Sequence, residues 1–183
     1  VNDAPALKRA DIGVAMGITG TEVSKEASDM ILSDDNFSSI VNAVEEGRTI
    51  YDNIQKFVNY LLSTNIGEIL IILIASIFAS YFNDVLPLIA IQLLWINLLT
   101  DGLPALALSV DPPRPNVMKL KPRDPKESII PKKMTFTIIV TGVLISIAVL
   151  ALFKLNLSDA LKAQSIAFTS LVIFEIVRLE AIR

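Results

Sequence analysis

Six polar side chains interrupt long apolar stretches of this sequence, and their types and spacing suit the binding of a cation. Two of them are three residues apart in one stretch, three occupy relative positions i, i+3 and i+4 in the next, and one lies in the last stretch. Residues three or four apart share one face of a helix, so each group presents its oxygens in one direction. In chain order they are Asn65, Glu68, Asn97, Thr100, Asp101 and Glu175.

The three carboxylates carry most of this interpretation. A carboxylate at bilayer depth costs roughly 2.5–3.5 kcal/mol on insertion scales, so it normally has a partner or a function. The sequence contains no histidine and no cysteine, which removes the usual zinc and copper ligands. A metal held here must be a hard cation bound by oxygen, and Ca²⁺ takes six to eight oxygens in a tolerant geometry.

Structural roles compete with this interpretation. Asn and Thr in membrane helices often only form hydrogen bonds across helices. Glu175 is followed one turn later by Arg178 and could pair with it. We interpret Tyr60, Gln92 and Trp95 as packing or interface residues. Glu68 and Asp101 are the residues for which a purely structural role is hardest to accept, and Glu175 is the weakest candidate of the three acids.

The composition indicates a membrane protein. Of 183 residues, 52% are hydrophobic, and the mean hydropathy is +0.58, which is too apolar for an ordinary soluble domain of this size. A net charge of −3 and the absence of an arginine-rich stripe argue against a nucleic-acid partner. The lipid bilayer is the expected partner.

The apolar stretches predict four membrane-spanning helices, at about 60–82, 85–110, 134–153 and 160–180. The link 111–133 carries seven basic residues against three acids, whereas the other links are short and carry a single basic residue between them. By the positive-inside tendency, the 111–133 loop and both chain ends are expected to be cytoplasmic.

The sequence before the first span predicts two further segments. Residues 1–40 alternate short helical and strand patterns, which indicates a small α/β segment with a parallel sheet. The helical pattern then runs without proline from about Phe37 to Phe82, with a charged stalk at 41–59. In the second span, Pro104 has no N–H to bond to Thr100, so we expect the helix to break beside Asp101. The predicted fold is mainly α, a polytopic helical membrane bundle with a short N-terminal α/β remnant.

Three strings resemble P-type ATPases of the calcium-pump branch. Residues 1–7, VNDAPAL, resemble the end of the family's hinge motif. STNIGE at 63–68 and LWINLLTDGLP at 94–104 resemble its fifth and sixth membrane helices. The resemblance implies that the four spans match helices five to eight, and that residues 1–40 end a HAD-like phosphorylation domain.

What the resemblance implies about function is an aspartyl-phosphate cycle that uses ATP and Mg²⁺ and transports Ca²⁺. Asn2 and Asp3 would lie beside the phosphate and its Mg²⁺, and the six membrane residues above would coordinate Ca²⁺, together with a further helix that is absent here. Arg178 beside Glu175 departs from the animal reticulum pumps and puts one of two ion sites in doubt.

The resemblance also defines what this stretch lacks. The phosphorylated aspartate, the nucleotide-binding and actuator domains and the first four membrane helices would belong to the missing N-terminal part of the same pump. We therefore expect the chain alone not to hydrolyse ATP. Two alternatives stay open: a pump that exports Mn²⁺ or Na⁺, and an inactive membrane remnant or passive channel.

Overall fold

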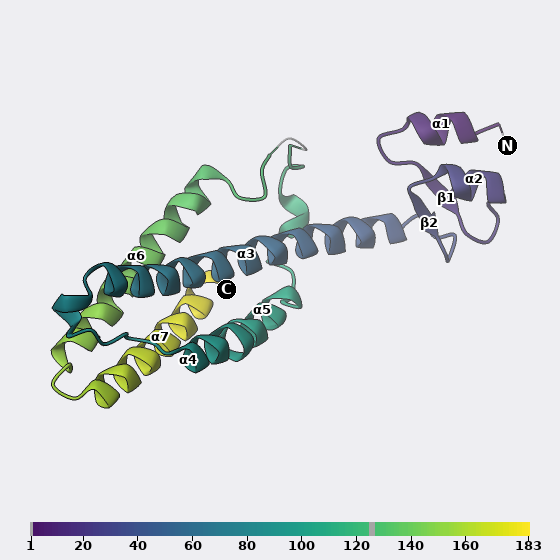
Figure 1. Ribbon diagram of the computed structural model, residues 1–183. Coiled ribbons are helices and arrows are strands. Elements are labelled where there is room, and N and C mark those ends of the chain that lie inside the picture. The colour runs from purple at the N-terminus through teal and green to yellow at the C-terminus, as the bar shows by residue number, and fades with distance from the viewer. Residues whose placement is uncertain (1, 125–126) are drawn as a thin grey trace. The chain divides into compact units, whose positions relative to one another are not determined.

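The computed structural model describes residues 2–124 and 127–183. Val1 of the first family-like string and the loop residues Pro125 and Lys126 lie outside that range. The described chain divides into two compact units. The first comprises 1–49 with 113–120, and the second comprises 50–112 with 121–183. Figure 1 shows the elements of both along the chain.

The first unit begins with the predicted α/β segment. Helix α1 (Ala4–Arg9) has proline in its first turn, where a missing N–H costs no hydrogen bond. Strand β1 (Val14–Met16) pairs in parallel with β2 (Met30–Leu32). Helix α2 (Glu22–Ala27) connects them, and its N-cap Thr21 accepts a hydrogen bond from the Ser24 N–H. The parallel pairing that was expected for this segment is confirmed.

Hydrogen bonds to Asp35 hold the end of the α/β segment. The Asp35 carboxylate accepts hydrogen bonds from the N–H groups of Ile18 and Thr19, each at 2.8 Å. These bonds, with one from the Thr19 hydroxyl, lower the pKa of Asp35 below its ordinary value. Asp35 itself has a positive φ of 50°, which Asp tolerates better than most residues. The loop after β2 is thereby tied to the loop after β1.

The long helix α3 (Ser39–Ile77) has 39 residues, and Asn36 accepts a hydrogen bond from the Ser38 N–H just before it. The α-helix ends at Ile77, not near Phe82 as expected. A 3₁₀ turn, η1 (Ala79–Phe82), follows, and the next two residues, Asn83 and Asp84, have φ of 53° and 59°. The left-handed backbone at these residues reverses the chain.

The second apolar stretch forms three consecutive pieces. They are α4 (Ala90–Trp95), a π-helical turn η2 (Ile96–Thr100) and α5 (Gly102–Ser109). The helix therefore starts later than the predicted residue 85. We expected the helix to break beside Asp101 because of Pro104. The structure instead has one widened, π-helical turn, which ends directly before Asp101. The chain continues through a short 3₁₀ turn, η3 (Val117–Lys119), in the first unit.

Two more helices complete the second unit, α6 (Lys132–Leu155) and α7 (Ala160–Ile182). A single apolar core joins α3, α6 and α7, with Ile71, Val149, Phe153 and Leu171 all wholly buried. Helices α3, α4–α5 and α6 are long and apolar enough to cross a membrane. Helix α7, which carries Lys162, Glu175, Arg178 and Glu180, is not among them.

Helices α3 and α6 cross closely at two glycines. A Cβ added at Gly142 would lie 2.6 Å from Ile66 Cγ2 and 3.2 Å from the Gly67 nitrogen. Gly67 precedes Glu68, so this crossing sets the distance between α6 and the helix that presents the first acid. Small residues of this kind let two membrane helices approach closely.

We expect Gly142→Ala to lower the apparent melting temperature of the complete protein in detergent by several degrees. The added methyl must push α3 and α6 apart, and overpacking of this kind costs about 1–3 kcal/mol. Gly47→Ala is the matched control, because no described atom lies within 4 Å of a Cβ built there. Gly47→Ala should leave the protein unchanged or slightly more stable. An equal loss in both variants would contradict the packing explanation.

Candidate cation site

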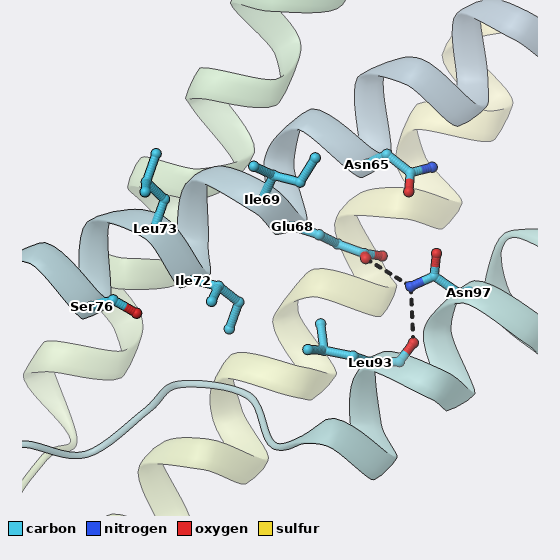
Figure 2. Close-up of a pocket in the computed structure, with 8 residues that line it drawn as sticks. All are labelled: Asn65, Glu68, Ile69, Ile72, Leu73, Ser76, Leu93 and Asn97. Atoms are coloured by element: carbon cyan, nitrogen blue, oxygen red, sulfur yellow. Dashed lines mark hydrogen bonds between the residues drawn. The ribbon is translucent and has the colours of Figure 1, made fainter.

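The candidate site lies in the second unit, where α3, the π-helical turn and α7 present their polar side chains. Glu68 is buried on α3, and its Oε2 accepts a hydrogen bond of 2.9 Å from the Asn97 amide. The same Asn97 amide also donates to the Leu93 carbonyl at 3.0 Å. Figure 2 shows Glu68 and Asn97 pointing toward each other, with Asn65 one turn before Glu68 on α3. These residues line a groove of about 520 Å³.

Asn65 lines this groove with its side chain turned back toward its own helix. Its amide donates to the Leu61 carbonyl at 2.7 Å, so the amide oxygen is the part of Asn65 that stays available as a ligand. Asn97 is likewise held through its NH₂ group by two acceptors. Both side chains therefore keep a carbonyl oxygen, the kind of atom that Ca²⁺ binds.

Carboxylate oxygens without partners mark the rest of the site. Asp101 is 2% exposed and Glu175 is 0% exposed. Within the described residues, neither carboxylate oxygen of Asp101 or Glu175 has a hydrogen-bond partner, and Glu68 Oε1 has none either. Buried polar groups are almost always satisfied, so these five oxygens are unusual and are available to a ligand.

The three acids share one region without forming a closed cluster. Helix α7, which carries Glu175, packs against the π-helical turn that directly precedes Asp101. In the part of the chain that the structure describes, however, no group of three or more acidic residues is close enough to hold a metal ion by itself. Of the predicted set, Glu68 and Asn97 are in direct contact, and the three carboxylates do not form a cage among the described residues.

Thr100 contributes through its backbone. Pro104 has no N–H to donate to the Thr100 carbonyl, and that oxygen accepts a hydrogen bond from the Tyr60 hydroxyl at 3.0 Å. The Asp101 N–H bonds to the Ile96 carbonyl at 2.9 Å, the i→i−5 pattern of a π turn. Such turns are frequent at functional sites.

Arg178 does not pair with Glu175. Its guanidinium donates to Asn59 Oδ1 at 2.9 Å and to Ser63 Oγ at 3.2 Å, both on α3. The alternative that Arg178 simply neutralises the neighbouring acid is therefore wrong for this structure. Glu175 keeps both oxygens free of described partners and stands beside Glu68 and Asp101 as an equal candidate.

Asn2 and Asp3 lie in the first unit, and both are exposed. Asp3 stands at the N-cap position of α1, yet its side chain forms no capping hydrogen bond. It lines a groove of about 380 Å³ beside β1. The alternative that Asp3 caps the helix through its side chain is not what the structure shows. Its carboxylate stays available for a ligand, and carboxylate and amide oxygens suit Mg²⁺.

Sequence reasoning missed Tyr60, which it assigned to packing. Tyr60 is wholly buried, and it forms the link between α3 and the π-helical turn. One signal was present: Tyr60, Thr64 and Glu68 follow one another at intervals of four, so they share a face of α3.

Comparison of the sequence with known proteins identifies the family of this chain. Residues 85–183 match the family model described as cation transporting ATPase, C-terminus. The chain therefore belongs to this family, and its apolar helices are those of a multi-pass membrane protein. The family-like strings at Ser63–Glu68 and Leu94–Pro104 correctly indicated it.

Three relatives show how far the similarity extends. A calcium-transporting ATPase of Bacillus subtilis is 51% identical over 181 residues, 97% of this chain and 20% of the relative. An endoplasmic reticulum-type calcium-transporting ATPase of Arabidopsis thaliana is 52% identical over 84% of this chain and 14% of its own length. A P-type sodium-transporting ATPase of Plasmodium falciparum is 57% identical over 74% of this chain and 10% of its own. The chain thus spans about a fifth or less of these relatives.

Proposed function

We propose that this chain supplies the cation-binding membrane part of an ATP-driven pump that works through an aspartyl phosphate, with Ca²⁺ as the transported ion. The single observation that carries the proposal is the set of five buried, unpaired carboxylate oxygens on Glu68, Asp101 and Glu175. Burying such groups is costly unless a partner arrives, and a divalent cation supplies two positive charges at once. Carbonyl oxygens of Asn65 and Asn97, and the Thr100 hydroxyl, would complete the ligand set.

The proposal extends to the membrane topology and the segments of the chain. Helix α7 would be the fourth span in the complete bundle, where its charged residues face other helices and not lipid. The 111–133 loop and both chain ends would be cytoplasmic because of the excess of basic residues in that loop. Residues 1–40 would end the phosphorylation domain, 41–59 would form the stalk and 60–183 the membrane domain.

ATP and Mg²⁺ would act in the complete pump. Asn2 and Asp3 would stand near the Mg²⁺, where the free Asp3 carboxylate fits a hard cation. When bound, Mg²⁺ supplies charge neutralisation for phosphoryl transfer. The phosphorylated aspartate and the nucleotide-binding domain would come from the part of the pump that precedes residue 1, so this chain by itself would not hydrolyse ATP.

One specific observation supports Na⁺ as an alternative transported ion. The Plasmodium falciparum relative named as sodium-transporting is at least as similar over its matched range as those named as calcium-transporting. Overall identity therefore does not separate the two ions, and Mn²⁺ shares the preference of Ca²⁺ for oxygen ligands. Three carboxylates in one site favour a divalent over a monovalent cation, because more negative charge raises divalent affinity most.

The deciding experiment measures phosphoenzyme formation from ATP in the complete protein, with Ca²⁺, Mn²⁺ or Na⁺ as the only added transport ion. We expect micromolar Ca²⁺ to activate phosphorylation and Na⁺ to fail at any physiological concentration. If Na⁺ or Mn²⁺ activates phosphorylation and Ca²⁺ does not, that ion is the transported ion and the assignment of Ca²⁺ is wrong. A complete protein that forms no phosphoenzyme with any of the three would favour the inactive remnant.

A further inference from the structure

The carbonyl of Thr100 lies at the one place in the second apolar stretch where the helical bonding pattern changes. In a regular helix this oxygen would accept a hydrogen bond from residue 104, but Pro104 has no N–H. A carbonyl left without a donor in apolar surroundings is destabilising. The structure supplies a donor from another helix, because the Tyr60 hydroxyl bonds to Thr100 O at 3.0 Å.

The Tyr60 side chain is confined by its surroundings. Its side chain is 0% exposed on the middle of α3. Thr64, one turn further on, is also wholly buried, and its hydroxyl is already committed to the Tyr60 and Leu61 carbonyls. Of these two hydroxyls on the same face of α3, only that of Tyr60 bonds to the π-helical turn.

The direction of this bond matters for the next residue. A phenol has one proton, and in this structure the Tyr60 hydroxyl donates it to Thr100 O. Both Asp101 oxygens remain without a partner in the described chain. The bond thus fixes the backbone directly before Asp101.

We infer that Tyr60 is a positioning residue for cation binding: through the Thr100 carbonyl it holds the π-helical turn so that Asp101 and Asn97 face Glu68. This inference rests on the proposed function and adds a residue to it that is not itself a ligand. Without the hydroxyl, Thr100 O loses its donor, and the turn relaxes toward other bonding patterns that carry Asp101 away.

The test is Tyr60→Phe in the complete protein, a substitution that removes one oxygen and keeps the ring. We expect the Ca²⁺ concentration for half-maximal phosphorylation from ATP to rise about tenfold, the effect of losing one buried hydrogen bond. Phosphorylation by inorganic phosphate without Ca²⁺ should stay at the wild-type level, because it does not require the occupied cation site.

Two further variants sharpen the test. Tyr51→Phe removes a hydroxyl from the same helix, one that accepts a local bond from Gln55 at 3.2 Å and forms no other bond within the described residues. This variant should leave Ca²⁺ activation unchanged. Pro104→Ala restores an N–H that can bond to Thr100 O, so the effect of Tyr60→Phe should shrink to about twofold in that background.

The outcomes separate this inference from the proposed function. If wild-type protein responds to Ca²⁺ and Tyr60→Phe responds identically, the positioning role is overturned and the pump proposal stands. If Tyr60→Phe lowers both phosphorylation signals equally, Tyr60 serves packing alone and the inference again fails. If wild-type protein does not respond to Ca²⁺ at all, the proposed function is wrong.

Discussion

Replacing Asp101 by Asn, or Glu68 by Gln, in the complete protein should raise the Ca²⁺ concentration needed for phosphorylation from ATP by about 100-fold or more. Each change keeps the shape of the side chain and removes one negative charge from the site. Ca²⁺ affinity depends strongly on the number of charged ligands. Glu175→Gln should act in the same direction, since its two oxygens are as isolated as those of Asp101.

The same substitutions should make the ion-free protein more stable. Five carboxylate oxygens are buried without partners in the described chain, and a neutral amide is less costly to bury than a charge. Thermal unfolding in detergent with a Ca²⁺ chelator should therefore show an equal or higher midpoint for each variant. Opposite effects on ion affinity and on stability are typical of a functional site and not of a packing residue.

Glu180→Gln is the matched control, because Glu180 is an exposed acid on the same helix as Glu175. It should change neither the Ca²⁺ dependence nor the unfolding midpoint. Phosphorylation by inorganic phosphate reports whether each variant is folded. Wild-type Ca²⁺ affinity in both Asp101→Asn and Glu68→Gln would show that the cation site is elsewhere.

The second large effect is expected at a buried ion pair outside the site. Lys56 Nζ lies 3.1 Å from Asp111 Oδ2, and both side chains are 5% exposed. Asn53 of the same helix donates to the Asp111 carbonyl at 2.8 Å. The pair thus joins α3 to the chain just beyond α5, one turn before Tyr60.

Asp111→Asn should destabilise the complete protein by roughly 3–5 kcal/mol, because it leaves the Lys56 ammonium buried without its counter-charge. The measurement is the unfolding midpoint in detergent. Removing both charges with Lys56→Met and Asp111→Asn together should recover most of the loss, since a buried pair is often no more stable than an apolar replacement. A double variant as unstable as the single one would contradict this explanation.

Arg183 provides the control for this prediction. Its guanidinium lies 3.1 Å from Asp111 Oδ1, but its side chain is 56% exposed. Water screens an ion pair of this kind, which contributes at most about 1 kcal/mol. Arg183→Gln should therefore shift the midpoint far less than Asp111→Asn.

Local sequence signals predicted much of the secondary structure. The alternating helix and strand patterns of residues 1–40 and the proline-free stretch from Phe37 each correspond to elements of the structure. The end of α3 was wrong, because the sequence near Ile77 contains no proline or glycine to stop a helix. The reversal depends on the left-handed backbone of Asn83 and Asp84, which Asn and Asp permit without requiring it.

For the site, the sequence by itself determined which residues are candidates. Acids and amides at helical spacing within apolar stretches single out Glu68, Asp101 and Glu175, because hydrocarbon makes a charge without a role too costly to keep. That inference needs only the identity of each residue and its neighbours along one helix.

Only the tertiary structure decided how these residues are held. The partner of the Thr100 carbonyl is Tyr60, 40 positions away, and the partners of Arg178 are Asn59 and Ser63, more than 100 positions away. The sequence shows that Pro104 removes a donor, but the replacement comes from whichever helix packs alongside. The physical reason is that a hydrogen bond between helices depends on their crossing, which the packing of the whole bundle sets and no local pattern encodes.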